Sequence, residues 1–160
     1  MYLDAMEFLE EERDAWRPYE ALAELTDEQL ERPVAEARDW SGRDLMVHML
    51  GWLEFLLASA KELAVREDSP ALAASERAQA DRGVDAMNAD MIERAAGRST
   101  ADIRETFRTL PGELRGYLTV VPETRWIKHQ SHLRAYLANS VEHYDDHKED
   151  LAAILAAART

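Results

Sequence analysis

Apolar residues recur every three or four positions along nearly the whole chain, and this helical periodicity most restricts the fold. Strict alternation of apolar and polar residues, the pattern of a half-buried strand, is not found, and valine and isoleucine are scarce. The chain is therefore expected to be all helical. The periodic segments, which predict five helices, are residues 3–25, 41–66, 70–96, 100–120 and 131–157.

Proline, glycine and capping residues mark where these helices begin, bend and end. Pro18 predicts a kink or break in the first helix, because proline removes a backbone hydrogen bond and clashes with the preceding turn. Ser41, with Asp44 three residues later, predicts a capped start for the second helix. Gly97 is expected to stop the third helix, and Pro111-Gly112 to bend or interrupt the fourth.

The helix count and the length of the chain together predict an architecture. A chain of 160 residues can bury one substantial core without disulfides. No internal repeat or linker divides it, so residues 1–160 are expected to form one domain. We predict an antiparallel four-helix bundle with one or two short extra helices, and Thr26-Asp27-Glu28 predicts a capped short turn leading to Leu30.

Composition excludes several classes of protein. The 32 acidic residues outnumber the 19 basic ones, for a net charge of −13, and no basic cluster is present, so nucleic-acid binding is not expected. The absence of cysteine excludes disulfides, thiolate metal sites and a cysteine nucleophile. The N-terminus has no signal-peptide pattern, and the longest apolar run, Phe55–Ala58, is too short for a membrane span. We therefore expect a cytoplasmic protein without membrane contact.

Histidines interrupt the apolar stripes of two helices. His143 and His147 lie on the inward stripe of the last helix, four residues apart, so their side chains project from the same face. His48 lies among Leu45, Met49 and later apolar residues on the stripe of the second helix. A buried imidazole without a hydrogen-bond partner costs about 1–3 kcal/mol. One divalent metal ion that took a nitrogen from each histidine would satisfy all three.

Two motifs resemble a known family. Trp40-Ser41-x-x-Asp44-x-x-x-His48 followed by Trp52, and Glu142-His143-x-x-x-His147 near the C-terminus, resemble the DinB/YfiT-like metal-binding bundle proteins. Within that superfamily the sequence is most similar to the N-terminal domain of mycothiol-dependent maleylpyruvate isomerases. The resemblance implies a DinB-like bundle with one long crossover, a metal triad of these three histidines, and a homodimer.

The sequence departs from those isomerases in two respects. They tend to have a carboxylate where His143 stands, and they carry a second, C-terminal domain that this sequence does not contain. The resemblance therefore favours their thiol chemistry rather than the isomerisation itself. It implies a metal-dependent enzyme that activates a low-molecular-weight thiol for transfer to an electrophilic small molecule.

Other functions stay open at the level of sequence. Three neutral imidazoles leave a divalent ion with an open position, which could hold water for hydrolysis as well as a thiol. A non-enzymatic module that binds metal or a small ligand is a further alternative, and the histidines could also bind nothing. Imidazole ligands suit zinc, nickel, copper and iron. Zinc or nickel is expected.

Several other residues are candidates for supporting roles. Asp44, Asp146 and Asp150 could orient the imidazoles by accepting hydrogen bonds, and Trp52 could form a pocket wall. The alternative roles are a helix-start acid for Asp44, a solvated face for the other two acids, and core packing for Trp52. Three further polar residues, His129, His132 and Asn88, are also considered as candidates. His129 and His132 form a rival pair that is expected at a pocket rim or exposed, and Asn88 could point to the site but is expected on the surface.

Overall fold

The computed structural model describes residues 1–160 and is all helical, with no strands. A single isolated bridge joins Val34 to Trp40. None of the helices combines the length and apolar character needed to cross a membrane. The α-helices are α1 (Ala5–Trp16), α2 (Asp27–Glu31), α3 (Gly42–Val65), α4 (Pro70–Arg82), α5 (Val84–Ala95), α6 (Thr100–Val120), α7 (Gln130–Ala138), α8 (Val141–Asp146) and α9 (Lys148–Ala158). The 3₁₀ segments are η1 (Arg17–Glu24), η2 (Ala35–Ala37) and η3 (Glu123–Arg125).

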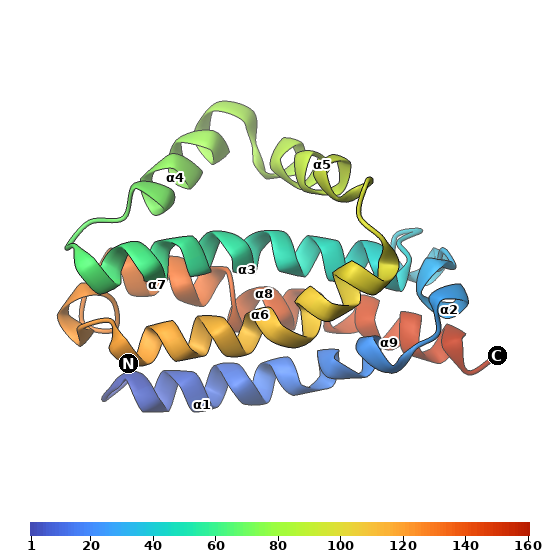
Figure 1. Cartoon of the computed structure of the whole chain (residues 1–160), viewed down its shortest axis with the longest axis horizontal. Coiled ribbons are helices and arrows are strands. Elements are labelled where there is room, and N and C mark those ends of the chain that lie inside the picture. Colours follow the sequence, from blue (N-terminus) through green and yellow to red (C-terminus); the bar gives the residue numbers. More distant parts are fainter.

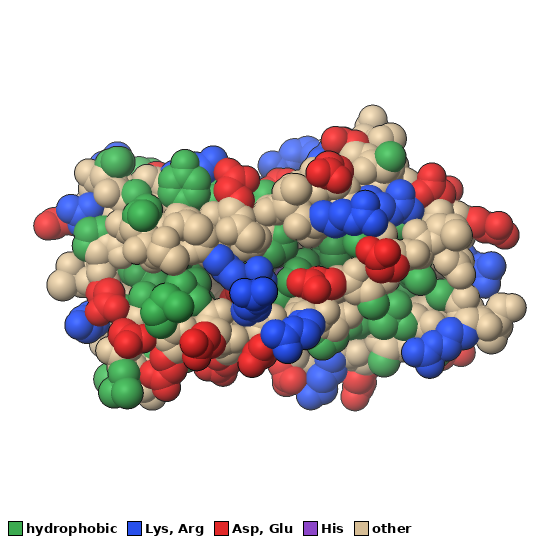
Figure 2. Space-filling model, turned by 60° about the horizontal axis from the view of Figure 1, so that its bottom comes forward, with side chains coloured by type: hydrophobic (Ala, Val, Ile, Leu, Met, Phe, Trp, Pro, Cys, Tyr) green, Lys and Arg blue, Asp and Glu red, His purple; other side chains and the backbone are tan.

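The long helices run side by side (Figure 1). Helix α3 packs along α6, α1 packs against α6 and α8, and the row formed by α7, α8 and α9 lies beside α3. Helices α4 and α5 form an arch over the side of α3 that faces away from α6, and both of them contact α3. Acidic and basic side chains are intermingled on the face shown in Figure 2, and no histidine is visible there. Histidine side chains are therefore not exposed on this face.

Local sequence explains where the helices on the N-terminal side begin and end. Thr26 and Gln29 form a capping box that starts α2, and Ser41 and Asp44 form another that starts α3. The predicted second helix over 41–66 is thus confirmed. The predicted break at Pro18 is also confirmed, because the α-helical part of the first segment ends at Trp16 and continues as η1.

The predicted third helix over 70–96 is wrong as one continuous element. It is divided into α4 and α5 at Gly83, whose φ of 82° is accessible to glycine at little cost. This break allows the two helices to form the arch. The fourth helix, which was expected to bend or break at Pro111-Gly112, is not interrupted, because α6 continues through Pro111 although a proline cannot donate the helical hydrogen bond.

The last predicted helix, over 131–157, is wrong as one element and consists of α7, α8 and α9. The first break lies at Ser140, whose backbone is irregular (φ −129°, ψ −98°) and whose Oγ donates to the Tyr136 carbonyl at 2.6 Å. A hydroxyl that takes over a backbone acceptor competes with the helical ladder. The second break lies at His147 itself, with φ −104° and ψ 5°. His143 and His147 therefore belong to a short helix and to its end.

A buried polar network fastens α8 to its neighbours. The Tyr144 hydroxyl donates to Glu12 on α1 at 2.9 Å, and the Tyr144 carbonyl accepts from the Tyr19 hydroxyl at 2.6 Å. Glu12, whose side chain is 3% exposed, is also paired with Arg115 on α6. Both ends of Tyr144 are thereby fixed, and with them the position of the adjacent His143.

The Glu12–Arg115 pair predicts a large cost for removing one partner. Arg115→Met leaves the Glu12 carboxylate buried without its cation, so the free energy of unfolding should fall by about 3 kcal/mol. Urea denaturation measures this loss. Arg66→Met is the matched control, because Arg66 pairs with Asp68 at the surface, and it should cost less than about 1 kcal/mol. Equal losses of stability for the two substitutions would contradict the predicted contribution of the buried Glu12–Arg115 pair.

Candidate metal centre

Three histidines from two rows of the fold meet between α3 and the C-terminal row. His48 lies on the second turn of α3, His143 on α8, and His147 at the junction of α8 and α9. The Nε2 atom of His48 is 2.8 Å from that of His143 and 3.0 Å from that of His147. The structure thus brings together the three histidines that the sequence predicted as ligands.

The environment of the three imidazoles is largely closed to solvent. His48 and His147 are buried, and His143 is half-buried. Burial, together with the neighbouring imidazoles, lowers the pKa of His48 from 6.5 to about 3. The same two causes lower the pKa of His143 to about 4. At neutral pH His48 and His143 are therefore uncharged, which is the state in which a histidine nitrogen binds a metal.

Hydrogen atoms cannot satisfy all of these short contacts. The Nδ1 of His147 lies 2.8 Å from the Asp150 carboxylate, so Nδ1 carries the proton and Nε2 presents a bare lone pair. If His48 Nε2 is also bare, the two lone pairs face each other at 3.0 Å. If His48 Nε2 carries a proton instead, that proton must be shared between two acceptors. In each neutral arrangement at least one contact is poorly satisfied.

A cation resolves this conflict. Nitrogens separated by 2.8 and 3.0 Å can each lie about 2.0–2.1 Å from one shared ion, the usual distance for imidazole and zinc. The three residues offer one ligand atom each, and these atoms lie within 4.8 Å of one another. His48, His143 and His147 could therefore hold a divalent metal ion.

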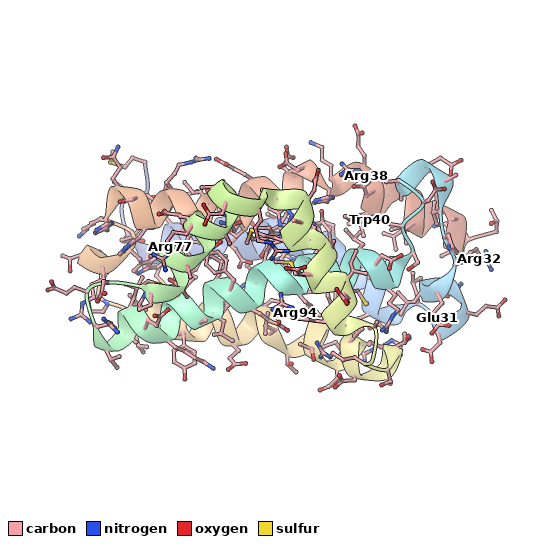
Figure 3. The ribbon with its side chains drawn as sticks, turned by 90° about the horizontal axis from the view of Figure 1, so that it is seen from above. Glu31, Arg32, Arg38, Trp40, Arg77 and Arg94 are labelled. Atoms are coloured by element: carbon pink, nitrogen blue, oxygen red, sulfur yellow. The ribbon has the colours of Figure 1, made fainter.

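Asp150 and the loop before α3 complete one side of the cluster. Asp150 is buried and accepts the hydrogen bond from His147. The Trp40 ring lies 5.7 Å from that of His147, in a stacked arrangement, and 4.9 Å from that of His48. Figure 3 shows Arg38 and Trp40 close together beside the C-terminal row. This loop thus covers the two buried histidines.

The histidines line a cavity of about 820 Å³ under the arch. Trp52 forms part of its wall and lies 6.3 Å, between ring centres, from His143. The Trp52 Nε1 donates to the Asn88 side-chain oxygen at 3.0 Å, so α5 is attached to the wall. The remaining lining residues combine polar and apolar side chains, namely Arg38, Trp40, Gln79, Val84, Asp85, Ala89, Ile92, Ala138, Asn139 and Asp146.

The other predicted candidates have different outcomes. Asp44 is occupied by the capping box, where its carboxylate accepts from the backbone and hydroxyl of Ser41, so the helix-start interpretation is supported. Asp146 is exposed and lines the cavity, without a hydrogen bond to a histidine. Trp52 is both buried and part of the cavity wall. The expectation that Asn88 lies free on the surface is wrong, because it is half-buried against Trp52.

The rival pair His129 and His132 has a structural role. His129 Nδ1 accepts from the backbone N–H of His132 and so caps α7. The two rings stack at 3.7 Å, and His132 Nδ1 lies 2.6 Å from the Arg125 carbonyl. Neither residue belongs to the cluster of potential ligands.

Sequence reasoning missed the contributions of Arg38 and Trp40 to this site. Trp40 was recognisable only as part of a motif, and its place over the imidazoles depends on the turn before it. Two consecutive non-glycine residues there, Arg38 and Asp39, have left-handed backbone conformations. No residue pattern predicts such a turn.

One comparison with known proteins identifies a family for this chain. A model of the mycothiol maleylpyruvate isomerase N-terminal domain family matches residues 9–143, most of the chain. The match includes His48 and ends at His143, four residues before His147. Comparisons with curated proteins and with solved structures gave no match. The chain belongs to the mycothiol maleylpyruvate isomerase N-terminal domain family, within the DinB-like proteins.

Proposed function

We propose that this protein binds one divalent metal ion through His48, His143 and His147. We further propose that it is a metal-dependent enzyme that activates a low-molecular-weight thiol for transfer to an electrophile. The observation that supports both is the convergence of three histidine Nε2 atoms at the wall of an 820 Å³ cavity. Membership of a mycothiol-related family favours a thiol as the bound nucleophile.

The chemistry follows from the ligand set. His48, His143 and His147 would hold a divalent ion as three neutral ligands, and that ion would keep its charge and would lower the pKa of a thiol bound to it. Asp150 orients His147 by accepting its Nδ1 proton. Trp40 lies against His48 and Trp52 lies near His143, so both rings would limit the access of water to the histidine cluster. A small electrophile would enter the cavity beneath α5, next to Asn88.

The proposal extends to architecture and assembly. We assign α1, α3, α6 and the row α7–α9 to the helices of a single DinB-like four-helix bundle, with the α4–α5 arch as its long crossover. We also propose a homodimer, on the basis of the family resemblance, and a cytoplasmic location, which the absence of cysteine fits. Zinc and nickel are the ions proposed, because imidazole nitrogens suit both.

Metal content should depend on the three histidines. The protein without an affinity tag should bind one zinc or nickel per chain, and His143→Ala or His48→Ala should abolish stoichiometric binding, because each removes one of three ligands. Elemental analysis after gel filtration measures this. His129→Ala and His132→Ala are the matched controls and should retain the metal. Full metal content in His143→Ala, or its loss in the controls, would contradict the proposed ligand set.

Turnover should require both metal and thiol. A panel of electrophiles, assayed with and without an added low-molecular-weight thiol, should show thioether formation only with the thiol present. His143→Ala should lower this rate by at least about a hundredfold if metal activation supplies several kcal/mol. Hydrolysis without thiol would replace the proposal with a metal-dependent hydrolase. Saturable ligand binding without turnover would replace it with a binding module.

The metal-free protein should lose stability in acid. The folded state holds the pKa of His48 near 3 and that of His143 near 4, whereas both are 6.5 when unfolded. Their contribution is fully present above pH 6.5, and it is lost as the pH falls toward 4 because the unfolded chain takes up protons first. Urea titrations at several pH values should show a loss of roughly 3 kcal/mol for His143, since one pKa unit is about 1.4 kcal/mol.

A variant separates this effect from general acid denaturation. His143→Gln has no imidazole to protonate, so its stability should fall less steeply between pH 6.5 and 4 than that of the metal-free wild type. Parallel curves for the two proteins would show that His143 is not held neutral by the fold.

A further inference from the structure

A positively charged side chain lies beside the candidate metal site. Arg38 lines the same cavity as the three histidines and lies over the Trp40 ring, with its guanidinium carbon 5.9 Å from the ring centre. A cation there repels a metal ion, so on charge alone its position is unfavourable. Its presence calls for a role that outweighs this repulsion.

The backbone holds Arg38 in place at a cost. Arg38 has φ 60° and ψ 29°, and Asp39 also has a positive φ of 62°. Each non-glycine residue in this region costs of order 1 kcal/mol, so the surroundings must enforce the turn. The Val34–Trp40 bridge does so, with the Val34 N–H donating to the Trp40 carbonyl at 3.0 Å. The turn thus fixes Arg38 and Trp40 together over the site.

Arg38 is connected to His147 through the Asp150 carboxylate, which contacts both of them. Its Nε lies 3.5 Å from Oδ2 of Asp150, the same oxygen that accepts from His147 Nδ1 at 2.8 Å. The Asp150 side chain is only 7% exposed, whereas that of Arg38 is 60% exposed. The Nδ1 atoms of His48 and His143 are buried without any partner. Only His147 is oriented in this way.

We propose that Arg38 is a positioning residue that acts through Asp150. It holds the carboxylate against His147 Nδ1, which keeps the proton on that nitrogen and leaves Nε2 bare and directed at the other two imidazoles. The inference rests on the proposed metal site, because its consequence is tighter metal binding.

Charge and positioning predict opposite signs for the same substitution. If Arg38 acts only as a nearby charge, its removal strengthens cation binding, since a repulsive partner is lost. If it positions His147 through Asp150, its removal weakens binding. Loss of such outer contacts typically costs ten- to a hundredfold in metal affinity.

The test is a double-mutant cycle on zinc affinity, measured by competition with a chromophoric chelator. Arg38→Asn tolerates the left-handed backbone and removes the charge, and Asp150→Asn keeps the shape of the acceptor. Asp150→Asn should weaken zinc binding about ten- to a hundredfold. Arg38→Asn should weaken it severalfold, and it should add no further loss in the Asp150→Asn background. Arg66→Asn, in the exposed Arg66–Asp68 pair, controls for net charge and should change affinity less than about twofold.

Two results would overturn the inference. One is Arg38→Asn binding zinc as tightly as the wild type or more tightly, and the other is an undiminished Arg38→Asn effect in the Asp150→Asn background. Arg38→Lys keeps the charge and should recover part of the lost affinity. Failure of the wild type itself to bind zinc would instead contradict the proposed function.

Nuclear magnetic resonance of the metal-free protein gives a readout independent of zinc. Long-range proton–nitrogen spectra of the imidazoles should show His147 as the Nδ1–H tautomer in the wild type. Asp150→Asn should shift this toward a tautomer mixture, and Arg38→Asn should shift it in the same direction to a smaller extent. An unchanged His147 tautomer in both variants would contradict the proposed chain of contacts even if metal affinity changed.

Discussion

The rest of this structure is arranged around three imidazole nitrogens that meet at the wall of a cavity. His48 Nε2 faces His143 Nε2 at 2.8 Å and His147 Nε2 at 3.0 Å, and a single proton or lone pair on it cannot satisfy both contacts. A folded chain can tolerate such a cluster only if other contacts hold it together, or if a cation occupies its centre. The surrounding structure supplies the first and permits the second.

The contacts that hold the cluster come from every part of the chain. Helix α3 presents His48 from a start fixed by a capping box, and Tyr144 attaches α8 to α1 through Glu12. Arg43 on α3 donates to the carbonyls of Ala95 and Arg98, which fastens the end of the arch to the same helix. The position of the imidazoles is therefore a property of the whole fold.

The sequence was sufficient for the elements that depend on periodicity and caps. The helix at Gly42–Val65, the break after Trp16 and the His143–His147 pair were predictable from local spacing, whereas His48 also required the inference that its helix faces theirs. The breaks at Gly83 and Ser140 were not predicted. A glycine within a helical pattern is often tolerated, and the competition of Ser140 for the Tyr136 carbonyl is visible only in three dimensions.

The polar partners of the site were harder to predict than its ligands. Asp150 could be named as a neighbour of His147, because it follows His147 by three positions, a spacing that brings side chains together on a helix. Arg38 depends on a turn of two left-handed residues, and the geometry of such a turn follows from tertiary contacts rather than residue type. The same contrast applies to function. The local residue pattern indicates a metal site, whereas the side chains that line the cavity around it decide which reaction the site can support.

X-ray absorption spectroscopy of the zinc- or nickel-loaded protein tests the central claim most directly. If His48, His143 and His147 bind the metal, its first coordination shell should contain three imidazole nitrogens at about 2.0–2.1 Å and at least one further light-atom ligand. A shell with fewer than three imidazoles, or one made mainly of carboxylate oxygens, would show that the metal binds elsewhere and would contradict the account.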